Sequence, residues 1–584
     1  MNRRNFLKGV MPLALAPLAF NGIPVRVMGQ SALTSSFSCE EVSDRILVLI
    51  QLHGGNDGLN TLIPLEQYNT YKSLRPLIGI KDSGPRKYIE LDSTMANQDQ
   101  VGLHPDLMAM KSMYDDGLVH IVQDVSYPDN NGSHFKGTDI LLSGKDGINM
   151  PENPVDGWFG RYLDHRYPNY PDVYPNPDME DPPGLEFGSH IVSLGFHRQV
   201  GIPMGLTLSN NPTSFQSLLS GVGGALPDQF PASDYGAELQ YLVEMERSTN
   251  VYAERLDQLF TAGTNDPSVT YPDVYHTPTQ FNYKNRLAPQ LKTVARLISG
   301  GSRTKIFLVR MGGFDTHAHQ ALAGKPSYGA HGSLLYHLSQ SVKAFQDDLA
   351  AQGLADRVMT VTLSEFGRQV AENGTMGTDH GTSAPMMIFG RGVNPGVSGT
   401  NPNLNQINNN NFTSYQHDYR QVFTTVMQDW LGANNGTLDE TGFYEFSGQK
   451  LNLVNSQYND GSGNLVNYVA DTTCDTTPDL PTLTTSISHP ASTQVQVEIG
   501  PNPTSGMLNI QFEWSRMQPA HLALYDMQGR TVLERELRMF AGMVQTSWDI
   551  GSLHAGTYVL QIVANKGSAF SSRVICTEKI VVTE

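Results

Sequence analysis

The sequence is poor in cysteine and in charge, and each shortage excludes a class of protein. Its three cysteines, Cys39, Cys474 and Cys576, stand far apart without a C-x-x-C pair, so neither a disulfide framework nor a thiolate metal cluster is expected. Any metal must therefore use His and carboxylate ligands. Only 16% of the residues are charged, against about 25% in an average soluble domain. The net charge is −18 and no lysine and arginine block relieves it, which argues against nucleic acid as a partner.

What the chain has in quantity is length, glycine and proline. Its 584 residues allow roughly three to four domain-sized units at about 150 residues each. The 55 glycines and 34 prolines indicate a protein with long loops. Loops of this kind commonly carry function, so we look for the site there.

The N-terminus has the features of an export signal. Arg3 and Arg4 are followed by Phe6-Leu7-Lys8 and by the weakly apolar run 10–20, which is too short to span a bilayer comfortably. This pattern resembles a twin-arginine signal, which we place at residues 1–30 with cleavage between about Gly22 and Ser31. Such signals direct folded proteins across the membrane, often with a cofactor already inserted. We expect passage through the periplasm, and no transmembrane helix in the mature protein.

The composition changes near the other end of the chain. Residues 471–494 are rich in Thr, Ser and Pro and are predicted to be a linker. Short alternating segments follow, including Leu508–Phe512 and Tyr558–Val563, and they predict a β-sandwich over residues 495–584. The spaced motifs around Asn502, Gly529 and Gly556 resemble the C-terminal sorting domain of type nine secretion cargo.

That resemblance implies transport across the outer membrane of a Bacteroidota-type cell, followed by surface attachment or release. The twin-arginine and type nine machineries would then be partners, together with an unknown extracellular substrate or ligand. An alternative is an ordinary accessory sandwich that binds carbohydrate or packs on the main domain.

The central region, residues 44–455, alternates buried strands with helical segments. The apolar runs predict five strands, and Leu334, Leu338, Val342 and Phe345 recur at helical spacing. This order indicates an α/β fold with a mostly parallel sheet covered by helices on both faces. Ligand sites of such folds lie beyond the carboxyl ends of the strands. The five predicted strands are 46–52, 119–125, 305–311, 358–363 and 386–389.

Polar residues suited to a hard or borderline cation follow these strands. They include His53-Gly-Gly-Asn-Asp57, Asp315-Thr-His317-Ala-His319, Ser364-Glu365 and Asp379-His380. Carboxylates and imidazoles without thiolates suit zinc, manganese or magnesium in a hydrolytic site.

Over residues 45–432 the chain resembles the group called domain of unknown function 1501, within the alkaline phosphatase superfamily. In that superfamily a carboxylate after the first strand binds one metal, a D-x-x-x-H motif and a late His serve the other, and an Asp-His pair completes the first. The resemblance implies a divalent metal, zinc or manganese, and a weaker second site for magnesium or calcium. The residues that match the pattern are Asp57, Asp315, His319, Glu365 and His380.

Two departures from the pattern leave the chemistry open. Phe366 stands where the paired His should be, and Asn130 stands where the reactive hydroxyl should be. The candidate catalytic residues are therefore Ser133 and His134, with Ser133 as nucleophile beside the histidine. A metal-bound water that attacks directly, or a site that binds without turnover, are the other two possibilities.

Several candidate residues also have a structural interpretation. Asp57 lies in Asn-Asp-Gly, a common turn former, and Ser133 is suited to cap a helix that begins after it. His317 is favoured as a hydrogen-bonded residue rather than a ligand, and Asp379 as one that caps or orients.

The sequence thus leaves two main hypotheses. The first is an exported, metal-dependent hydrolase acting on phosphate or sulfate esters at the cell surface or outside the cell. The second is a non-catalytic member of the fold that binds a surface ligand. A metal-dependent isomerase or mutase is a weaker third, because export removes the usual cytosolic sugar phosphates.

Overall fold

The computed structural model describes the core of the chain and the strands of its tail. The described core comprises residues 44–171, 174–189, 192–208, 252–278, 282–459 and 465–475, and the described tail consists of seven strands between residues 497 and 582. Of the predicted signal only β1 (Ala19–Phe20) and β2 (Ile23–Pro24) are described. The rest of the signal, residues 476–494 of the linker and the first two residues of the predicted sandwich lie outside the described residues.

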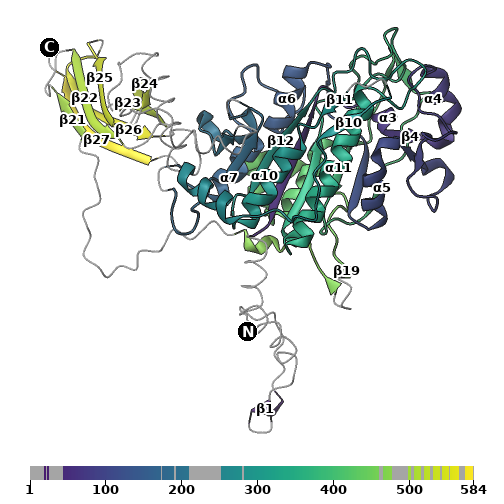
Figure 1. Ribbon diagram of the computed structural model, residues 1–584. Helices are drawn as coiled ribbons and strands as arrows, with labels where there is room; N and C mark the ends of the chain where they lie inside the picture. The colour runs from purple at the N-terminus through teal and green to yellow at the C-terminus, as the bar shows by residue number, and fades with distance from the viewer. Residues whose placement is uncertain are drawn as a thin grey trace.

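A nine-stranded mixed sheet forms the centre of the core (Figure 1). Seven consecutive residues of one of its two longest strands, Ile46 to Leu52, are at most 1% exposed, so the sheet is covered on both faces. The strands in spatial order are β15 (Gly396–Ser398), β7 (Val119–Ser126), β14 (Ala384–Phe389), β13 (Val358–Leu363), β3 (Ile46–His53), β12 (Ile306–Gly312), β8 (Gly184–Phe187) and β9 (Gly205–Leu208), with β18 (His417–Asp418) paired to β7.

Helices cover this sheet in two groups. α10 (Ala288–Ser299) and α11 (Ala330–Ala351) lie side by side over the sheet in Figure 1. The second group packs around the fully buried Trp158, whose ring contacts Phe423 and Phe443. It consists of α6 (His134–Ser143), α7 (Trp158–Arg166), α12 (Tyr419–Thr425) and α13 (Asn435–Thr441).

Smaller elements flank the first strand. α3 (Gly58–Thr61) follows β3 directly, and α4 (Tyr68–Leu74) and α5 (Met108–Asp115) follow it along the chain. A three-stranded sheet lies among them, formed by β4 (Leu62–Pro64), β6 (Val101–Leu103) and β5 (Ile89–Glu90).

The direction of the strands fixes where a site can form. β3, β12 and β13 are parallel, and β14 is antiparallel both to β13 and to β7, so β7 runs with the first three. The carboxyl ends of four strands and the amino end of β14 therefore share one edge of the sheet. The predicted α/β class with a mostly parallel sheet is confirmed, and the loops expected to carry the site leave the sheet at this edge.

The tail forms two antiparallel sheets that share one apolar cluster, which confirms the predicted β-sandwich. One sheet is β21 (Val497–Gly500), β22 (Met507–Trp514) and β25 (Gly542–Asp549). The other is β24 (Thr531–Met539), β23 (Gln518–Tyr525), β26 (Gly556–Ala564) and β27 (Arg573–Val582). The sequence prediction missed β24 and β25. β24 is an edge strand, where charged side chains such as those of Glu534 and Arg535 are tolerated and obscure the apolar alternation.

Candidate metal centre

Loops from five strands meet at the carboxyl edge of the sheet. The backbone N–H of Gly54, after β3, donates to Oε1 of Glu365, after β13, at 2.7 Å. His134, which follows β7, places Nδ1 2.8 Å from the same oxygen. His380, which precedes β14, lies 3.2 Å from Asp315, which follows β12. Residues that are far apart in the sequence thus converge here.

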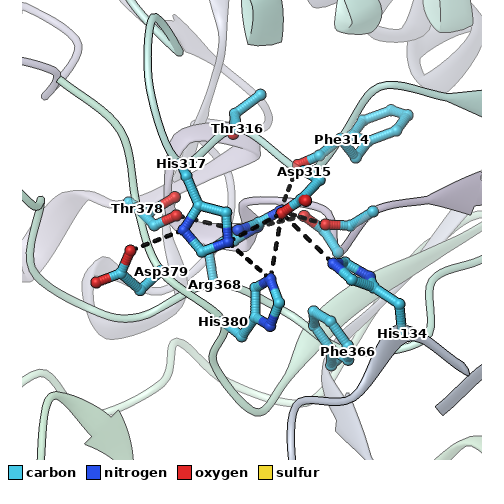
Figure 2. A network of polar contacts seen from close by, with 12 residues as sticks. His134, Phe314, Asp315, Thr316, His317, Phe366, Arg368, Thr378, Asp379 and His380 are labelled. Carbon is cyan, nitrogen blue, oxygen red and sulfur yellow. Dashed lines mark hydrogen bonds and ion pairs between the residues drawn. The ribbon is translucent and has the colours of Figure 1, made fainter. Parts of the chain in front are cut away.

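Three imidazole rings point at one carboxylate oxygen (Figure 2). Asp315 Oδ1 lies 3.4 Å from Nε2 of His134 and 3.2 Å from Nε2 of both His317 and His380. The Nε2 atoms of His317 and His380 are 2.8 Å apart. Within the described chain, His134, Asp315 and His380 form a group whose ligand atoms all lie within 4.8 Å of one another. We call this group the His134–Asp315–His380 cluster.

The outward nitrogen of each ring contacts a hydrogen-bond acceptor, which fixes the tautomer. A carbonyl or carboxylate oxygen can only accept, so Nδ1 carries the proton and, in a neutral ring, Nε2 presents a lone pair. The acceptors, each at 2.8 Å, are Glu365 Oε1 for His134, the Gly132 carbonyl for His380 and Asp379 Oδ1 for His317.

The inner atoms of the cluster are therefore all electron-pair donors. The Nε2 atoms of His380 and of the neighbouring His317 are 2.8 Å apart, beside the Asp315 carboxylate. Their lone pairs repel one another unless a proton or a cation lies between them. His134 Nε2 is buried and makes no hydrogen bond to any described residue. An oriented ring with an unused inner nitrogen is the arrangement of histidines that bind metals, so these residues fit a divalent ion.

Arg368 fixes the carboxylate of the cluster. Its guanidinium is fully buried and donates from Nη2 to Asp315 Oδ1 at 2.7 Å and to the Phe314 carbonyl at 2.8 Å, while Nη1 donates to the Thr378 carbonyl at 3.0 Å. Burial raises the pKa of the Asp315 carboxyl, but Arg368 and His380 outweigh that effect and lower the pKa to about 2. Asp315 is therefore an anion at neutral pH.

Glu365 and Phe366 form the inner wall of the cluster. The side chain of Glu365 is fully buried, and its second oxygen, Oε2, has no hydrogen-bond partner among the described residues. The Phe366 ring lies 4.8 Å from the His134 ring and 4.9 Å from the His380 ring, measured between centroids. The residue found in place of the expected imidazole thus packs on two of the histidines.

The structure places two of the predicted ligands outside the cluster. Asp57 is buried, and its carboxylate accepts hydrogen bonds from Arg75 and Gln320. His319 is exposed, with φ of 56°, and its backbone N–H donates to the Thr375 carbonyl at 3.3 Å. Asp315, Glu365 and His380 are brought together, although Glu365 contacts His134 rather than the inner oxygen of Asp315.

The loop after β7 uses its polar side chains to hold its own shape. Ser133 is the N-cap of α6, and its hydroxyl accepts from the Lys136 backbone N–H at 3.4 Å. Asn130 donates to the Thr382 carbonyl at 2.9 Å and accepts from the Gly132 N–H at 3.1 Å. Both nitrogens of the His134 ring face carboxylates, so this ring is not positioned to take a proton from Ser133.

Sequence reasoning named His134 as a catalytic residue beside Ser133 and favoured His317 as a hydrogen-bonded residue, and it named neither as a metal ligand. The signal that pointed to them was their position in loops after strand ends, since each lies in a polar segment directly after an apolar run. Asp379, interpreted from the sequence as an orienting residue, holds His317, and that hydrogen bond lowers the pKa of the Asp379 carboxyl.

Fold and site together define an α/β protein with a candidate centre made of histidine and carboxylate ligands, joined to a β-sandwich tail. Residues 287–454 match the family model described as protein of unknown function (DUF1501), and residues 498–577 match the secretion system C-terminal sorting domain. Both predicted resemblances are thereby confirmed. The second match implies export through type nine secretion, toward the cell surface or the extracellular space.

Comparison with solved structures finds matches of low sequence identity and low TM-score. The PsFucS1 sulfatase from Pseudoalteromonas sp. is 8% identical and covers 90% of this chain and 89% of its own, with a TM-score of 0.28. A protein studied in glycosaminoglycan metabolism by Bacteroides thetaiotaomicron is 9% identical over 85% of this chain and 90% of its own, with a TM-score of 0.29. The lipoteichoic acid synthase LtaP from Listeria monocytogenes is 10% identical over 66% and 71%, with a TM-score of 0.22. Comparison with curated protein sequences gives no significant match.

A search for membrane-spanning helices in the described part of the chain finds none of sufficient length and apolarity.

Proposed function

We propose that the protein is an exported hydrolase that depends on a divalent metal and acts on phosphate or sulfate esters. The observation that carries the proposal is the convergence of Nε2 of His134, Nε2 of His380 and Oδ1 of Asp315, with each ring oriented by an acceptor behind it. Two imidazoles and one carboxylate are the ligand set of many catalytic zinc sites, and they leave a position open. We therefore favour zinc, or manganese, at this cluster. The ester class follows from the superfamily resemblance of the sequence.

The residues of the cluster have separable roles in this proposal. His134, His380 and Asp315 would hold the ion, and Arg368 keeps Asp315 ionised and fixed. A divalent ion bound there would supply Lewis-acid polarisation of the ester oxygen. Phe366 packs on two of the rings and limits their movement.

A third histidine, His317, lies beside the cluster. Its side chain is 46% exposed, and Asp379 holds its Nδ1, so that Nε2 faces the carboxylate of the cluster. In this position His317 can serve as an additional ligand, or it can hold a proton at Nε2 beside the substrate.

A matched pair of variants tests the proposal. Full-length protein is purified, its metal content is measured, and hydrolysis of aryl phosphate, phosphodiester and sulfate substrates is assayed. His380→Ala is expected to lose the metal and any activity. His319→Ala is expected to keep both, because His319 is exposed and lies outside the cluster. Equal loss in the two variants would contradict the assignment of the ligands.

One observation favours the alternative of a non-catalytic binding protein. Asn130 stands where the superfamily nucleophile is expected and uses both ends of its side chain to hold the loop, and Ser133 caps α6. A protein that retains one tightly bound ion but hydrolyses none of the three substrate types would favour this alternative.

The export route of the proposal has its own test. We propose that the twin-arginine pair Arg3-Arg4 directs the folded protein to the periplasm before type nine secretion. Replacing both arginines by lysine should leave the protein in the cytoplasm, which cell fractionation measures. Normal delivery of the double variant would point to a different route.

A further inference from the structure

The second metal position expected from the sequence requires Asp57 and Glu365 to share an ion. Neither side chain is placed for that. Asp57 Oδ1 and Oδ2 accept from Arg75 Nη1 at 2.9 and 2.7 Å, and Oδ2 also accepts from Gln320 Nε2 at 2.5 Å. Glu365 Oε1 accepts from Gly54 and contacts His134. Oε2 of Glu365 has no hydrogen-bond partner among the described residues. The Glu365 side chain borders a small cavity lined mainly by apolar groups, among them Leu141, Leu363, Phe366 and Met386.

The positive charge that Asp57 requires is already present. Arg75, the C-cap residue of α4, is fully buried, as is the carboxylate that it contacts. Burial raises the pKa of Asp57, but the charge and hydrogen bonds of Arg75 outweigh burial and hold the pKa below its usual value. Asp57 therefore remains an anion with a fixed cation beside it.

Arg75 is itself held at every donor group. Nη1 also donates to Asn60 Oδ1 at 2.9 Å, Nη2 donates to the Gln369 carbonyl at 2.8 Å, and Nε donates to the Val370 carbonyl at 2.7 Å. A guanidinium with its donors satisfied on three sides does not leave its place to admit an ion, because each contact would be lost without water to replace it.

A layer of neutral side chains separates Asp57 from the His134–Asp315–His380 cluster. Gln320, which donates to Asp57, accepts from Thr316 at 3.0 Å and from Thr378 at 2.7 Å. The Thr378 carbonyl in turn accepts from Arg368, the partner of Asp315. Asp57 is thus connected to the cluster through a chain of hydrogen-bonded side chains and carbonyl groups.

We infer that the Arg75 guanidinium stands in for a second metal ion, and that the centre holds a single ion per chain. The inference rests on the proposed function for the first ion and refines its chemistry. Two-metal sites stabilise both the attacking and the leaving oxygen. Arg75 is fully buried and cannot touch a substrate, so it supplies the charge that Asp57 needs but none of the second ion's contacts with substrate.

The test counts ions on the full chain. Protein stripped with chelator is reloaded with zinc or manganese, with magnesium or calcium in excess, and the bound ions are counted by elemental analysis and native mass spectrometry. One ion per chain is expected, and Asp57→Asn should retain that ion with a Kd within about threefold of the wild type. Two ions in the wild type, or loss of an ion in Asp57→Asn, would overturn the inference.

A second arm does not depend on the first ion. Arg75→Gln removes the fixed cation and leaves Asp57 unpaired, so its melting temperature should fall and should be raised again by millimolar manganese or calcium. The matched control, Arg75→Gln with Asp57→Asn, should show no such rise. If neither the wild type nor the variant binds an ion at the cluster, the proposed function fails. A rise in the melting temperature of Arg75→Gln on addition of cation would still support the inference that Arg75 replaces a metal ion. The absence of that rise would refute this inference.

Discussion

The hydrogen bond between Glu365 and His134 gives the sharpest test of the metal centre. Glu365 is fully buried, and its Oε1 lies 2.8 Å from His134 Nδ1. Glu365→Gln keeps the size of the side chain and leaves a carbonyl oxygen that can still accept from Gly54, but it removes the negative charge behind the imidazole. The His134 ring then becomes a weaker electron-pair donor and is oriented less firmly.

The expected size of the effect follows from the role of such partners. Replacing the residue that orients a ligating histidine typically weakens metal affinity by about 10- to 100-fold. This corresponds to about 1.4 to 2.8 kcal/mol of binding free energy. We expect the loss of affinity in Glu365→Gln to lie in the upper part of this range, because the Glu365 carboxylate is buried and solvent does not screen its charge.

Asp379→Asn is the matched control. Asp379 holds His317 in the same way and at the same 2.8 Å, but the carboxylate is 49% exposed and solvent screens it. The loss of affinity should therefore stay within about fivefold, since an exposed ion pair contributes about 0–1 kcal/mol and 1.4 kcal/mol corresponds to about tenfold.

Competition with a chromophoric chelator measures the Kd of each variant, and circular dichroism of the metal-free protein checks that both fold. A Kd for Glu365→Gln within twofold of the wild type would refute the orienting role. Complete loss of the ion would instead show that Glu365 is itself a ligand, as the sequence resemblance implied.

The remaining predictions concern pH, the helix cap and the tail. Hydrogen bonds to Asp475 and Glu440 raise the pKa of His165 to about 9, so this contact should stabilise the fold fully below about pH 6.5 and lose that contribution as pH rises through about 9. After a discount for solvent screening we expect about 1–2 kcal/mol, measured by urea unfolding from pH 6 to 10, and His165→Gln should lack the slope. Ser133→Ala should lower the free energy of unfolding by about 0.5–2 kcal/mol, because the N-cap of α6 is lost, and Ser133→Asp should restore this stability. A fall in kcat beyond about 1000-fold in both variants, on the order of the loss of a nucleophile, would instead favour Ser133 as the attacking group. Deleting residues 495–584 should leave the melting temperature and the metal content of the core unchanged and prevent release from the cell, and a core that unfolds without the tail would show that the sandwich is part of one unit.

The sequence was sufficient for the five central strands of the nine-stranded sheet, because a strand covered on both faces must be apolar throughout, but it did not predict the short strands β8, β9, β15 and β18. The predicted strand 358–363 has the observed bounds, and 46–52 and 119–125 each end one residue early. The antiparallel direction of β14 carries no such signature, since its apolar residues serve equally well in either direction.

The motif that named His319 failed to place it for a physical reason. Spacing of four residues brings two side chains together only on a helix. The segment after β12 is an irregular loop in which His319 has a left-handed backbone conformation, and His319 is not among the residues whose ligand atoms gather around Asp315 in the described chain. His317, two residues from Asp315, contacts the carboxylate instead.

Arg75 could not be identified from the sequence at all. It is the residue that follows α4, in a segment with no motif, and its partner Asp57 is eighteen positions earlier in the chain. Its role depends on the path of the chain between α3 and α4, which brings the guanidinium under the loop after β3. Burial of a charged pair of this kind has no periodic pattern, because both residue types are usually exposed.

The way the cluster is assembled bears on the export hypothesis. His134, Asp315 and His380 come from three separate loops, and their orientation depends on Gly132, Glu365 and Arg368. None of these contacts is local in sequence, so the ligands exist as a site only after the sheet has formed. Metal affinity is then coupled to folding, and an unfolded chain would offer only isolated histidines and carboxylates. A route that moves an already folded chain allows the ion to bind before export, whereas a route that threads an unfolded chain requires the site to form afterwards. Insertion of the ion before export is therefore possible only on the first of these routes, which is the one that the arginine pair at the N-terminus predicts.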